Sequence, residues 1–248
     1  MADDPKRELY QLQEGILVQL QNIGDPQFSS AKLCGGTALD RCWLGHRLSY
    51  DLDFFLPQGF GAGKLAVALK KAGVEYETTD IVDSLDRANQ LHGYVLQGAR
   101  RLKVSFVEDA YFDLFPPITS PFGGVTVRTE CVEGLYHRKL RTVSGHASHG
   151  DPVEGGRQKA RNVFDLYVLS RKVMPIRPFI VLLPYAFPAA AFENGLVSMP
   201  WFDLVDELAQ IICDPEWEQA RDIEFLQNAL YLEIGANVVL EDDPDAAL

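Results

Sequence analysis

The middle third of the chain carries a dense pattern of strand-forming segments, and this pattern restricts the chain to folds that contain a sheet. Four segments between residues 74 and 130 are rich in β-branched and aromatic residues: VEYETT, HGYVLQ, RLKVSFV and GVTVRTE. The turns between the first three are short and polar or contain glycine, which favours antiparallel hairpins. The sequence therefore predicts a hairpin-rich sheet, with a proline-bearing loop, YFDLFPPITSPFGG, before the last strand.

Helical patterns flank these strands. Apolar residues at helical spacing predict helices over residues 8–22, 61–71, 131–143 and 159–172, and helices throughout the rest of the chain after residue 174. Two further strands are expected, at residues 31–34 and at Tyr50–Leu56. The predicted fold class is α+β, with a mixed or antiparallel sheet and flanking helices, followed by a small helical C-terminal domain. We expect domains at 1–174 and 175–240, and a disordered tail at 241–248.

Charge is distributed unevenly along the chain. The net charge of −12 counts against a nucleic-acid partner, because phosphate binding needs Lys and Arg. Residues 100–177, however, hold 13 Lys and Arg against 8 Asp and Glu, whereas the stretch from Glu193 onward holds 14 acidic residues and one arginine. Arg100, Arg101 and Lys103 are either a basic rim for an RNA backbone or ordinary charges at a strand end.

No targeting or membrane signal is expected. The longest apolar stretches, such as residues 179–192, are too short to span a bilayer and are broken by Pro184 and Pro188. The acidic, polar N-terminus does not resemble a signal peptide, so a cytoplasmic protein without membrane contact is predicted. Four scattered cysteines suggest neither a disulfide framework nor a zinc site. The pair His146 and His149 has ligand-like spacing, but its glycine-rich loop favours an ordinary surface role.

The candidate chemistry starts with two carboxylates. Asp51 and Asp53 are two residues apart on a predicted strand, so their side chains point to the same face. Such a pair can hold Mg²⁺, which removes the repulsion between the carboxylates and neutralises a triphosphate. The pair alone is weak support, since other acid-x-acid pairs occur in this acidic chain.

A glycine turn strengthens that interpretation. Gly35 and Gly36 precede Thr37 at the start of a predicted short helix, and Thr37 lies fourteen residues before Asp51. Glycines let backbone N–H groups approach a phosphate closely, and a helix N-terminus favours anions. The sequence therefore places a candidate phosphate cradle beside a candidate metal site.

The segment GGTALDRCWLGHRLSYDLDFF (residues 35–55) resembles the first motif of the AbiEii/AbiGii nucleotidyltransferase toxins, a branch of the DNA polymerase β-like nucleotidyltransferase superfamily. The likeness includes LGHR, Ser49 two residues before Asp51, and the apolar pair after Asp53. The later segments GLYHRKLRTV and KARNVFDLYVL are similar to the family's lysine-bearing helix and the helix after it. The resemblance covers residues 8–172.

The resemblance implies a nucleotidyltransferase-like fold and a role for each matching residue. Asp51 and Asp53 are expected to be catalytic and to ligate Mg²⁺. Gly35, Gly36 and Thr37 are expected to hold the β- and γ-phosphates of an NTP, with Ser49 and Arg161 also at the nucleotide. Lys139 is expected to neutralise the triphosphate and Asp165 to support the site. The implied reaction is attack of an acceptor hydroxyl on the α-phosphate, with release of pyrophosphate.

Two positions depart from the family pattern. The strand next to the carboxylate pair normally offers a third carboxylate, but the alternation in RLKVSFVED places Ser105 there, with Glu108 on the opposite side. In the later helix Asn162 replaces the first Asp of the usual pair. Arg161 and Asp165 also fit an ion pair within one helix, and Lys139 fits a surface lysine.

Three functions follow from this interpretation. The first is a Mg²⁺-dependent nucleotidyltransferase toxin that acts on RNA, such as the 3′ end of tRNA, and is regulated by an antitoxin protein. The second keeps the reaction but changes the acceptor to a protein or a small molecule. The third is a catalytically silent nucleotide-binding module, because serine is a poor general base and a weak ligand of Mg²⁺.

Overall fold

The computed structural model of the protein describes residues 4–84, 86–144 and 159–235. His146, His149 and the tail at 241–248 lie outside the described residues. The chain divides into two compact units between His137 and Arg138. The functional boundary after residue 174 stays a prediction.

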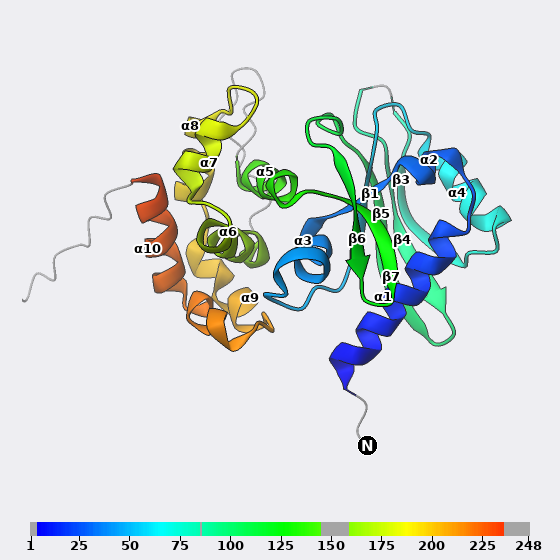
Figure 1. Cartoon of the computed structure of the whole chain (residues 1–248), viewed down its shortest axis with the longest axis horizontal. Helices are drawn as coiled ribbons and strands as arrows, with labels where there is room; N and C mark the ends of the chain where they lie inside the picture. Colours follow the sequence, from blue (N-terminus) through cyan, green and yellow to red (C-terminus); the bar gives the residue numbers. More distant parts are fainter. Residues whose placement is uncertain (1–3, 85, 145–158, 236–248) are drawn as a thin grey trace, which may run out of the picture. The chain divides into compact units, whose positions relative to one another are not determined.

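The first unit is built on a seven-stranded mixed sheet with the strand order β3-β4-β5-β2-β1-β7-β6 (Figure 1). Two neighbouring pairs, β2 with β5 and β1 with β7, are parallel, and the other pairs are antiparallel. The predicted class, a mixed sheet with flanking helices, is confirmed. The strands are β1 (Lys32–Cys34), β2 (Leu52–Leu56), β3 (Tyr76–Val82), β4 (Gln90–Gln97), β5 (Arg100–Glu108), β6 (Pro117–Phe122) and β7 (Val125–Glu130).

The order of the strands corrects part of the hairpin prediction. β3, β4 and β5 form the expected antiparallel hairpins. The fourth predicted strand, β7, instead pairs with β1 and with β6, which lies inside the segment predicted as a loop. Pro117 and Pro121 hid β6 from the sequence pattern. Its place at the edge of the sheet tolerates proline, because an edge strand leaves half of its N–H groups outside the ladder.

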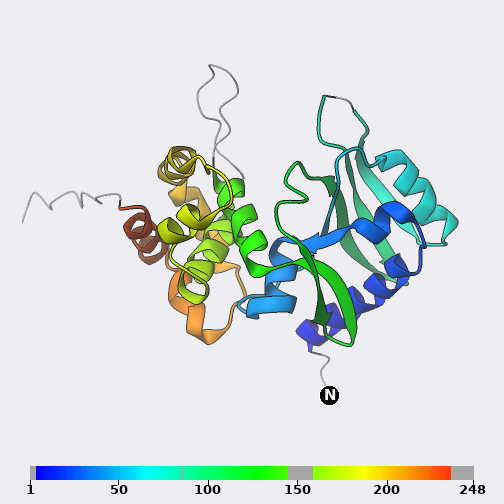
Figure 2. The same ribbon diagram turned by 45° about the horizontal axis from the view of Figure 1, so that its top comes forward.

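Three helices cover one face of the sheet: α1 (Pro5–Gln21), α2 (Pro26–Ser30) and α4 (Ala62–Lys71), as Figures 1 and 2 show. Phe28 of α2 meets the ring of Phe54 edge-on at 5.3 Å, and Phe54 stacks on Phe106 of β5 at 5.5 Å. Because side chains alternate along a strand, residues 53 and 105 face the opposite side of the sheet. The core therefore lies on one face, and the candidate chemistry on the other.

Two helix boundaries differ from the prediction. α1 starts at Pro5, where the side chain of Asp4 caps the helix by accepting a hydrogen bond from the backbone N–H of Lys6. α2 lies between the helix predicted over residues 8–22 and the strand predicted at 31–34, in a segment for which no helix was predicted. There Asp25 accepts hydrogen bonds from the N–H groups of Gln27 and Phe28, with Pro26 in the first turn. An Asp-Pro pair is a helix start signal that the sequence already contained.

The second unit is helical, as predicted. Its α-helices pack around a core that includes Trp201 and Trp217, each 7% exposed. Two short 3₁₀ helices, at Trp201–Leu204 and Pro215–Arg221, lie between the last three α-helices of the chain. No helix within the described ranges is both long enough and apolar enough to cross a bilayer. The α-helices are α5 (Val132–Val143), which begins in the first unit, α6 (Ala160–Lys172), α7 (Ile176–Leu182), α8 (Ala189–Val197), α9 (Val205–Ala209) and α10 (Ile223–Ile234).

Candidate active site

The diglycine bend joins β1 to a short helix, α3 (Gly35–Ala38), and it lies directly against the acidic segment. Gly35 has φ +73°, a conformation that side chains disfavour, and a Cβ there would lie 2.9 Å from Oδ2 of Asp53. A Cβ on Gly36 would collide with the guanidinium of Arg47 and lie 3.0 Å from Oγ of Ser49. The bend can therefore lie this close to Asp53, Arg47 and Ser49 only because both of its residues are glycine.

The two carboxylates sit at the start of β2. Asp53 is in register with Cys34 of β1 and with Ser105 of β5. The strand begins at Leu52 and not at the predicted Tyr50, because the backbone carbonyl of Asp51 accepts a hydrogen bond from the Thr37 hydroxyl instead of a neighbouring strand. Both aspartates are half-buried. The register also confirms that Ser105, and not a carboxylate, stands beside Asp53.

A buried polar network holds the bend against the acidic segment. Oγ1 of Thr37 lies 2.9 Å from Oγ of Ser49, whose backbone carbonyl accepts a hydrogen bond of 2.8 Å from Gln13 of α1. Thr37 and Ser49 are 2% and 7% exposed. These contacts fix the position of the two segments relative to each other. Direct contact of either hydroxyl with a nucleotide stays a prediction.

Arg47 is a site residue that the sequence pattern did not single out. Its side chain is 6% exposed, donates a hydrogen bond of 3.2 Å to the carbonyl of Leu48, and lies against Gly36. An arginine usually lies at the surface, so its residue type gives no signal of this burial. The LGHR match was the only indication in the sequence. Arg47 places a fixed positive charge beside the diglycine bend.

Gly35→Ala is expected to lower both stability and nucleotide affinity. Alanine at positive φ loses roughly 1–2 kcal/mol of unfolding free energy, and its Cβ would displace the carboxylate of Asp53. Gly73→Ala is the matched control, since Gly73 has φ +75° and a Cβ there would meet nothing within 4 Å. Urea denaturation should show a loss for both variants, and the loss should be at least as large for Gly35→Ala, because its Cβ also displaces Asp53. Calorimetry with Mg²⁺ and NTP should show lost affinity for Gly35→Ala alone, and equal affinities would contradict this geometry.

The helix after the bend carries a buried carboxylate. Residues Leu39–Leu44 form a π-helix, a rare form that is frequent at functional sites. Within it, burial raises the pKa of Asp40, while His46, a hydrogen bond from Tyr10 and the charges of Arg47 and Arg41 lower it by less. The net direction is upward. Asp40 therefore binds a proton more strongly in the folded protein than in the unfolded chain.

This shift predicts how stability depends on pH. A raised pKa adds stability at low pH, and this contribution disappears as the pH rises through the pKa of the folded state. The difference between the free energy of unfolding of the wild type and that of Asp40→Asn should therefore fall as the pH is raised from about 3 toward neutrality. A pH of about 3 lies below the ordinary pKa range of carboxyl groups. Urea denaturation across this range measures the difference. A difference that grows with pH would show that the neighbouring cations outweigh burial.

The second unit holds the later predicted residues in a buried cluster. Nζ of Lys139 on α5 lies 2.7 Å from Oδ2 of Asp165 on α6 and donates a hydrogen bond of 3.0 Å to Oδ1 of Asn162. Asp165 is fully buried and Lys139 nearly so. Lys139 is thus no surface lysine, and Asn162 accepts a hydrogen bond from it. Arg161 is exposed at the start of α6.

The residues of the first unit fit a magnesium–nucleotide site. Mg²⁺ is typically held by one or two carboxylates together with substrate phosphates, and Asp51 and Asp53 supply such a pair beside backbone that a Cβ would block. Within the described ranges, no group of three or more His, Cys, Asp or Glu side chains is placed to hold a metal ion. Further ligands would therefore have to come from the substrate and from water.

Comparison with known families decides the family. A model of the "Nucleotidyl transferase AbiEii toxin, Type IV TA system" matches residues 20–229, most of the chain. The chain belongs to the AbiEii nucleotidyltransferase toxin family. The match also corrects the extent of the resemblance, which the sequence motifs limited to residues 8–172. It continues through most of the helical segment that follows.

One solved structure supports the fold of this AbiEii protein. The structure described as "putative nucleotidyltransferase from H. pylori" is 18% identical, with 93% of this chain and 92% of that chain covered and a TM-score of 0.50. JHP933 from Helicobacter pylori is also 18% identical, with 92% and 90% covered and a TM-score of 0.49. At this identity the first likeness concerns the fold alone. A search of curated proteins gave no match.

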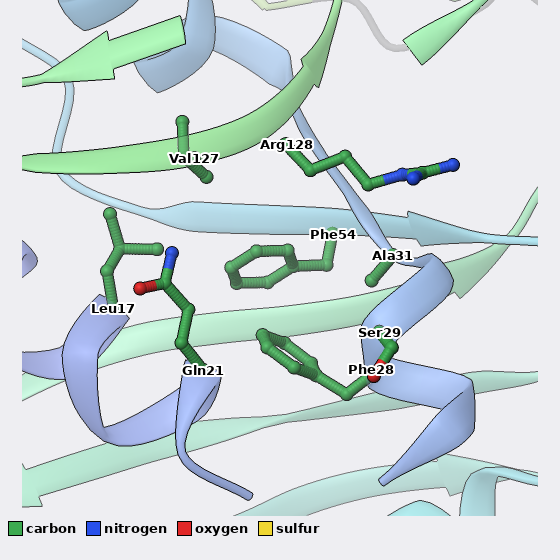
Figure 3. Close-up of a pocket in the computed structure, with 8 residues that line it drawn as sticks. All are labelled: Leu17, Gln21, Phe28, Ser29, Ala31, Phe54, Val127 and Arg128. Atoms are coloured by element: carbon green, nitrogen blue, oxygen red, sulfur yellow. The ribbon is translucent and has the colours of Figure 1, made fainter. Parts of the chain in front are cut away.

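One pocket of the AbiEii protein lies away from the site. It has a volume of about 130 Å³ and is bounded by α1, α2, β2 and β7 (Figure 3). Phe54 contributes to it, and Phe54 faces the side of the sheet opposite to Asp53. The pocket is therefore not part of the proposed nucleotide site. Its lining residues are Leu17, Gln21, Phe28, Ser29, Ala31, Phe54, Val127 and Arg128.

Proposed function

We propose that this AbiEii protein transfers a nucleotide from an NTP to the hydroxyl of an RNA acceptor, such as the 3′ end of tRNA, in a reaction that needs Mg²⁺. The family supports a nucleotidyltransferase of a type IV toxin–antitoxin system, with an NTP as substrate and an antitoxin protein as partner. The observation that carries the proposal is the contact between the diglycine bend and Asp53. It supports a site in which a backbone anion cradle lies next to a carboxylate pair.

Each residue has a proposed task. Asp51 and Asp53 hold Mg²⁺, which supplies positive charge to the phosphates when bound. The backbone of Gly35 and Gly36 lies along the β- and γ-phosphates, and the guanidinium of Arg47 adds positive charge behind the bend. Thr37 and Ser49 keep the bend and the carboxylates in position.

The residues of the second unit keep the roles that the resemblance implies. Lys139 neutralises the triphosphate, Asp165 orients the ammonium group of Lys139, and Arg161 contacts the nucleotide. The ion pair of 2.7 Å supports the task of Asp165, because a buried carboxylate at this distance restricts where the lysine can point.

The proposed step exchanges a phosphoanhydride bond of the NTP for a phosphate ester bond to the acceptor. The acceptor oxygen forms a bond to the α-phosphorus, the bond from that phosphorus to the bridging oxygen breaks, and pyrophosphate leaves. The hydroxyl proton passes to an aspartate of the pair or to water, since Ser105 is a poor base. Catalysis then depends on positioning and on charge, with little covalent work for the protein.

A transfer assay tests the proposal. Purified protein is incubated with total RNA, Mg²⁺ and each α-labelled NTP in turn. The proposal predicts labelled RNA with the wild type and none with Asp51→Asn/Asp53→Asn. Label in a protein band would instead favour a protein acceptor.

Ser105 favours one alternative, a nucleotide-binding module without catalysis, because it replaces a third carboxylate beside Asp53. This alternative predicts NTP affinity without release of pyrophosphate. Calorimetry with NTP, combined with a pyrophosphate assay, separates the two functions.

A further inference from the structure

The face of the sheet that carries Asp53 continues beyond the carboxylates onto β5 and β4. Ser105 of β5 pairs with Asp53 on one side and with His92 of β4 on the other. Two residues earlier on β5, Lys103 pairs with Tyr94, and Arg101 follows on the same face. Residues directly opposite in a sheet point to the same side, so these side chains share the face of the candidate site. We call His92, Tyr94, Arg101 and Lys103 the β4–β5 surface.

The β4–β5 surface is partly open to solvent and combines positive charge with an aromatic ring. Arg101 and Lys103 are exposed, and His92 and Tyr94 are half-buried. The guanidinium carbon of Arg101 lies 4.6 Å from the centre of the Tyr94 ring. Such a cation–π contact holds an aromatic ring and a positive charge together. Single-stranded nucleic acids are bound by this combination, with bases stacked on aromatic rings and phosphates beside cations.

The position of the positive charges indicates where a strand could lie. Asp53 pairs with Ser105 in the parallel register of β2 with β5, and Lys103 and Arg101 lie two and four residues before Ser105 on β5. Strands are about 4.8 Å apart and rise about 3.3 Å per residue, so the backbone of Lys103 lies about 8 Å, and that of Arg101 about 14 Å, from the backbone of Asp53. These cations sit in a chain whose net charge is −12. The two cations therefore make this place on the sheet attractive to a polyanion.

The far edge of the same face carries the opposite charge. Glu77 and Asp80 of β3 pair with Tyr94 and His92, and both are exposed. Their carboxylates repel phosphates, so a bound strand is confined to the side of the sheet nearer the catalytic carboxylates. The charges on this face therefore favour a strand that lies on the β5 side and away from the β3 edge.

We propose that the β4–β5 surface binds the acceptor of the reaction, a single-stranded RNA end with a free 3′ hydroxyl. Tyr94 stacks on an unpaired base, Arg101 holds the ring in place, and Lys103 contacts the phosphate next to the reacting hydroxyl. This inference rests on the proposed nucleotidyl transfer, which it deepens by assigning the acceptor site. The nucleotide donor occupies the diglycine bend, and the acceptor reaches the α-phosphate from the β5 side.

Binding of a fluorescent single-stranded RNA oligonucleotide, measured by anisotropy without NTP, tests the inference. Tyr94→Ala should weaken binding roughly five- to 150-fold, the range found when a stacked base loses its aromatic partner, whereas Tyr94→Phe should bind like the wild type. Arg101→Ala/Lys103→Ala should reduce the slope of log affinity against log salt by about 0.7 for each phosphate that the variant no longer neutralises. Lys70→Ala, an exposed lysine on α4 across the sheet, is the control and should change neither value.

A second measurement separates the acceptor site from the donor site. Calorimetry with Mg²⁺ and NTP should give equal affinities for Tyr94→Ala and the wild type. Unchanged RNA binding in Tyr94→Ala, with an unchanged salt slope in Arg101→Ala/Lys103→Ala, overturns the inference. Loss of NTP affinity alone, or transfer to protein in place of RNA, also overturns it. RNA binding that depends on Tyr94 without any transfer supports the surface and contradicts only the proposed function.

Discussion

Asp53→Asn should lower kcat/KM for nucleotidyl transfer by at least about a hundredfold to a thousandfold, the effect of removing one preorganised electrostatic contact to a transition state. The amide has the shape of the carboxylate but lacks its negative charge, so it is a poor ligand for Mg²⁺. Steady-state kinetics with labelled NTP and RNA measures the change. The unfolding free energy should stay within about 1 kcal/mol of the wild type, because asparagine keeps the shape of aspartate at this half-buried position.

The matched control for this variant is Glu75→Gln. Glu75 is exposed beside β3 in the same unit, and its neutralisation changes the net charge by the same amount. Glu75→Gln should keep wild-type kinetics. Equal activity of Asp53→Asn and Glu75→Gln would remove Asp53 from the catalytic site.

Lys32→Met should lower the free energy of unfolding by roughly 3–5 kcal/mol, the range for breaking a buried ion pair by removing one partner. Lys32 and Glu130 are each 1% exposed, and their charged atoms are 3.4 Å apart. Nζ of Lys32 also donates to the carbonyl of Phe112 and, at 2.9 Å, to that of Phe115. The substitution removes this donor from a carboxylate and two carbonyls in the interior. Urea denaturation followed by circular dichroism measures the loss.

The double variant Lys32→Met/Glu130→Leu tests whether the lost stability comes from the unpaired charge of Glu130 or from the changed shape of the side chain. Replacing both charges with apolar groups is often neutral or stabilising, so the double variant should recover much of the stability lost in Lys32→Met. A loss below about 1 kcal/mol in the single variant, the level of an exposed pair, would contradict the burial of this pair. Because Lys32 begins β1, the strand that leads into Gly35, the pair also anchors the candidate site to the sheet.

The local pattern of the site was predictable because it depends on residues close in sequence. The glycine turn, the short helix and the strand with Asp53 all follow from composition over a few residues. The family pattern together with alternation placed Ser105 beside Asp53. The exact start of β2 was not predictable. It depends on the hydroxyl of Thr37, which takes the carbonyl of Asp51 out of the sheet.

Long-range pairing explains the remaining differences. The parallel contact of β7 with β1 joins residues almost a hundred positions apart, as in the pair Leu33 and Thr129, and no turn signal specifies it. Lys32 is buried against its residue type because partners distant in sequence, Glu130, Phe112 and Phe115, accept its charge and its hydrogen bonds. The β4–β5 surface likewise follows from strand register, which the sequence pattern did not give.

A crystal of the protein with Mn²⁺ and a non-hydrolysable NTP analogue tests the central claim most directly, since Mn²⁺ occupies oxygen-ligand sites like those of Mg²⁺ and scatters anomalously. The proposed mechanism predicts an anomalous peak in coordination contact with Asp51 and Asp53, and a triphosphate along the backbone of Gly35 and Gly36. A nucleotide bound elsewhere, or a metal peak away from this carboxylate pair, would contradict it.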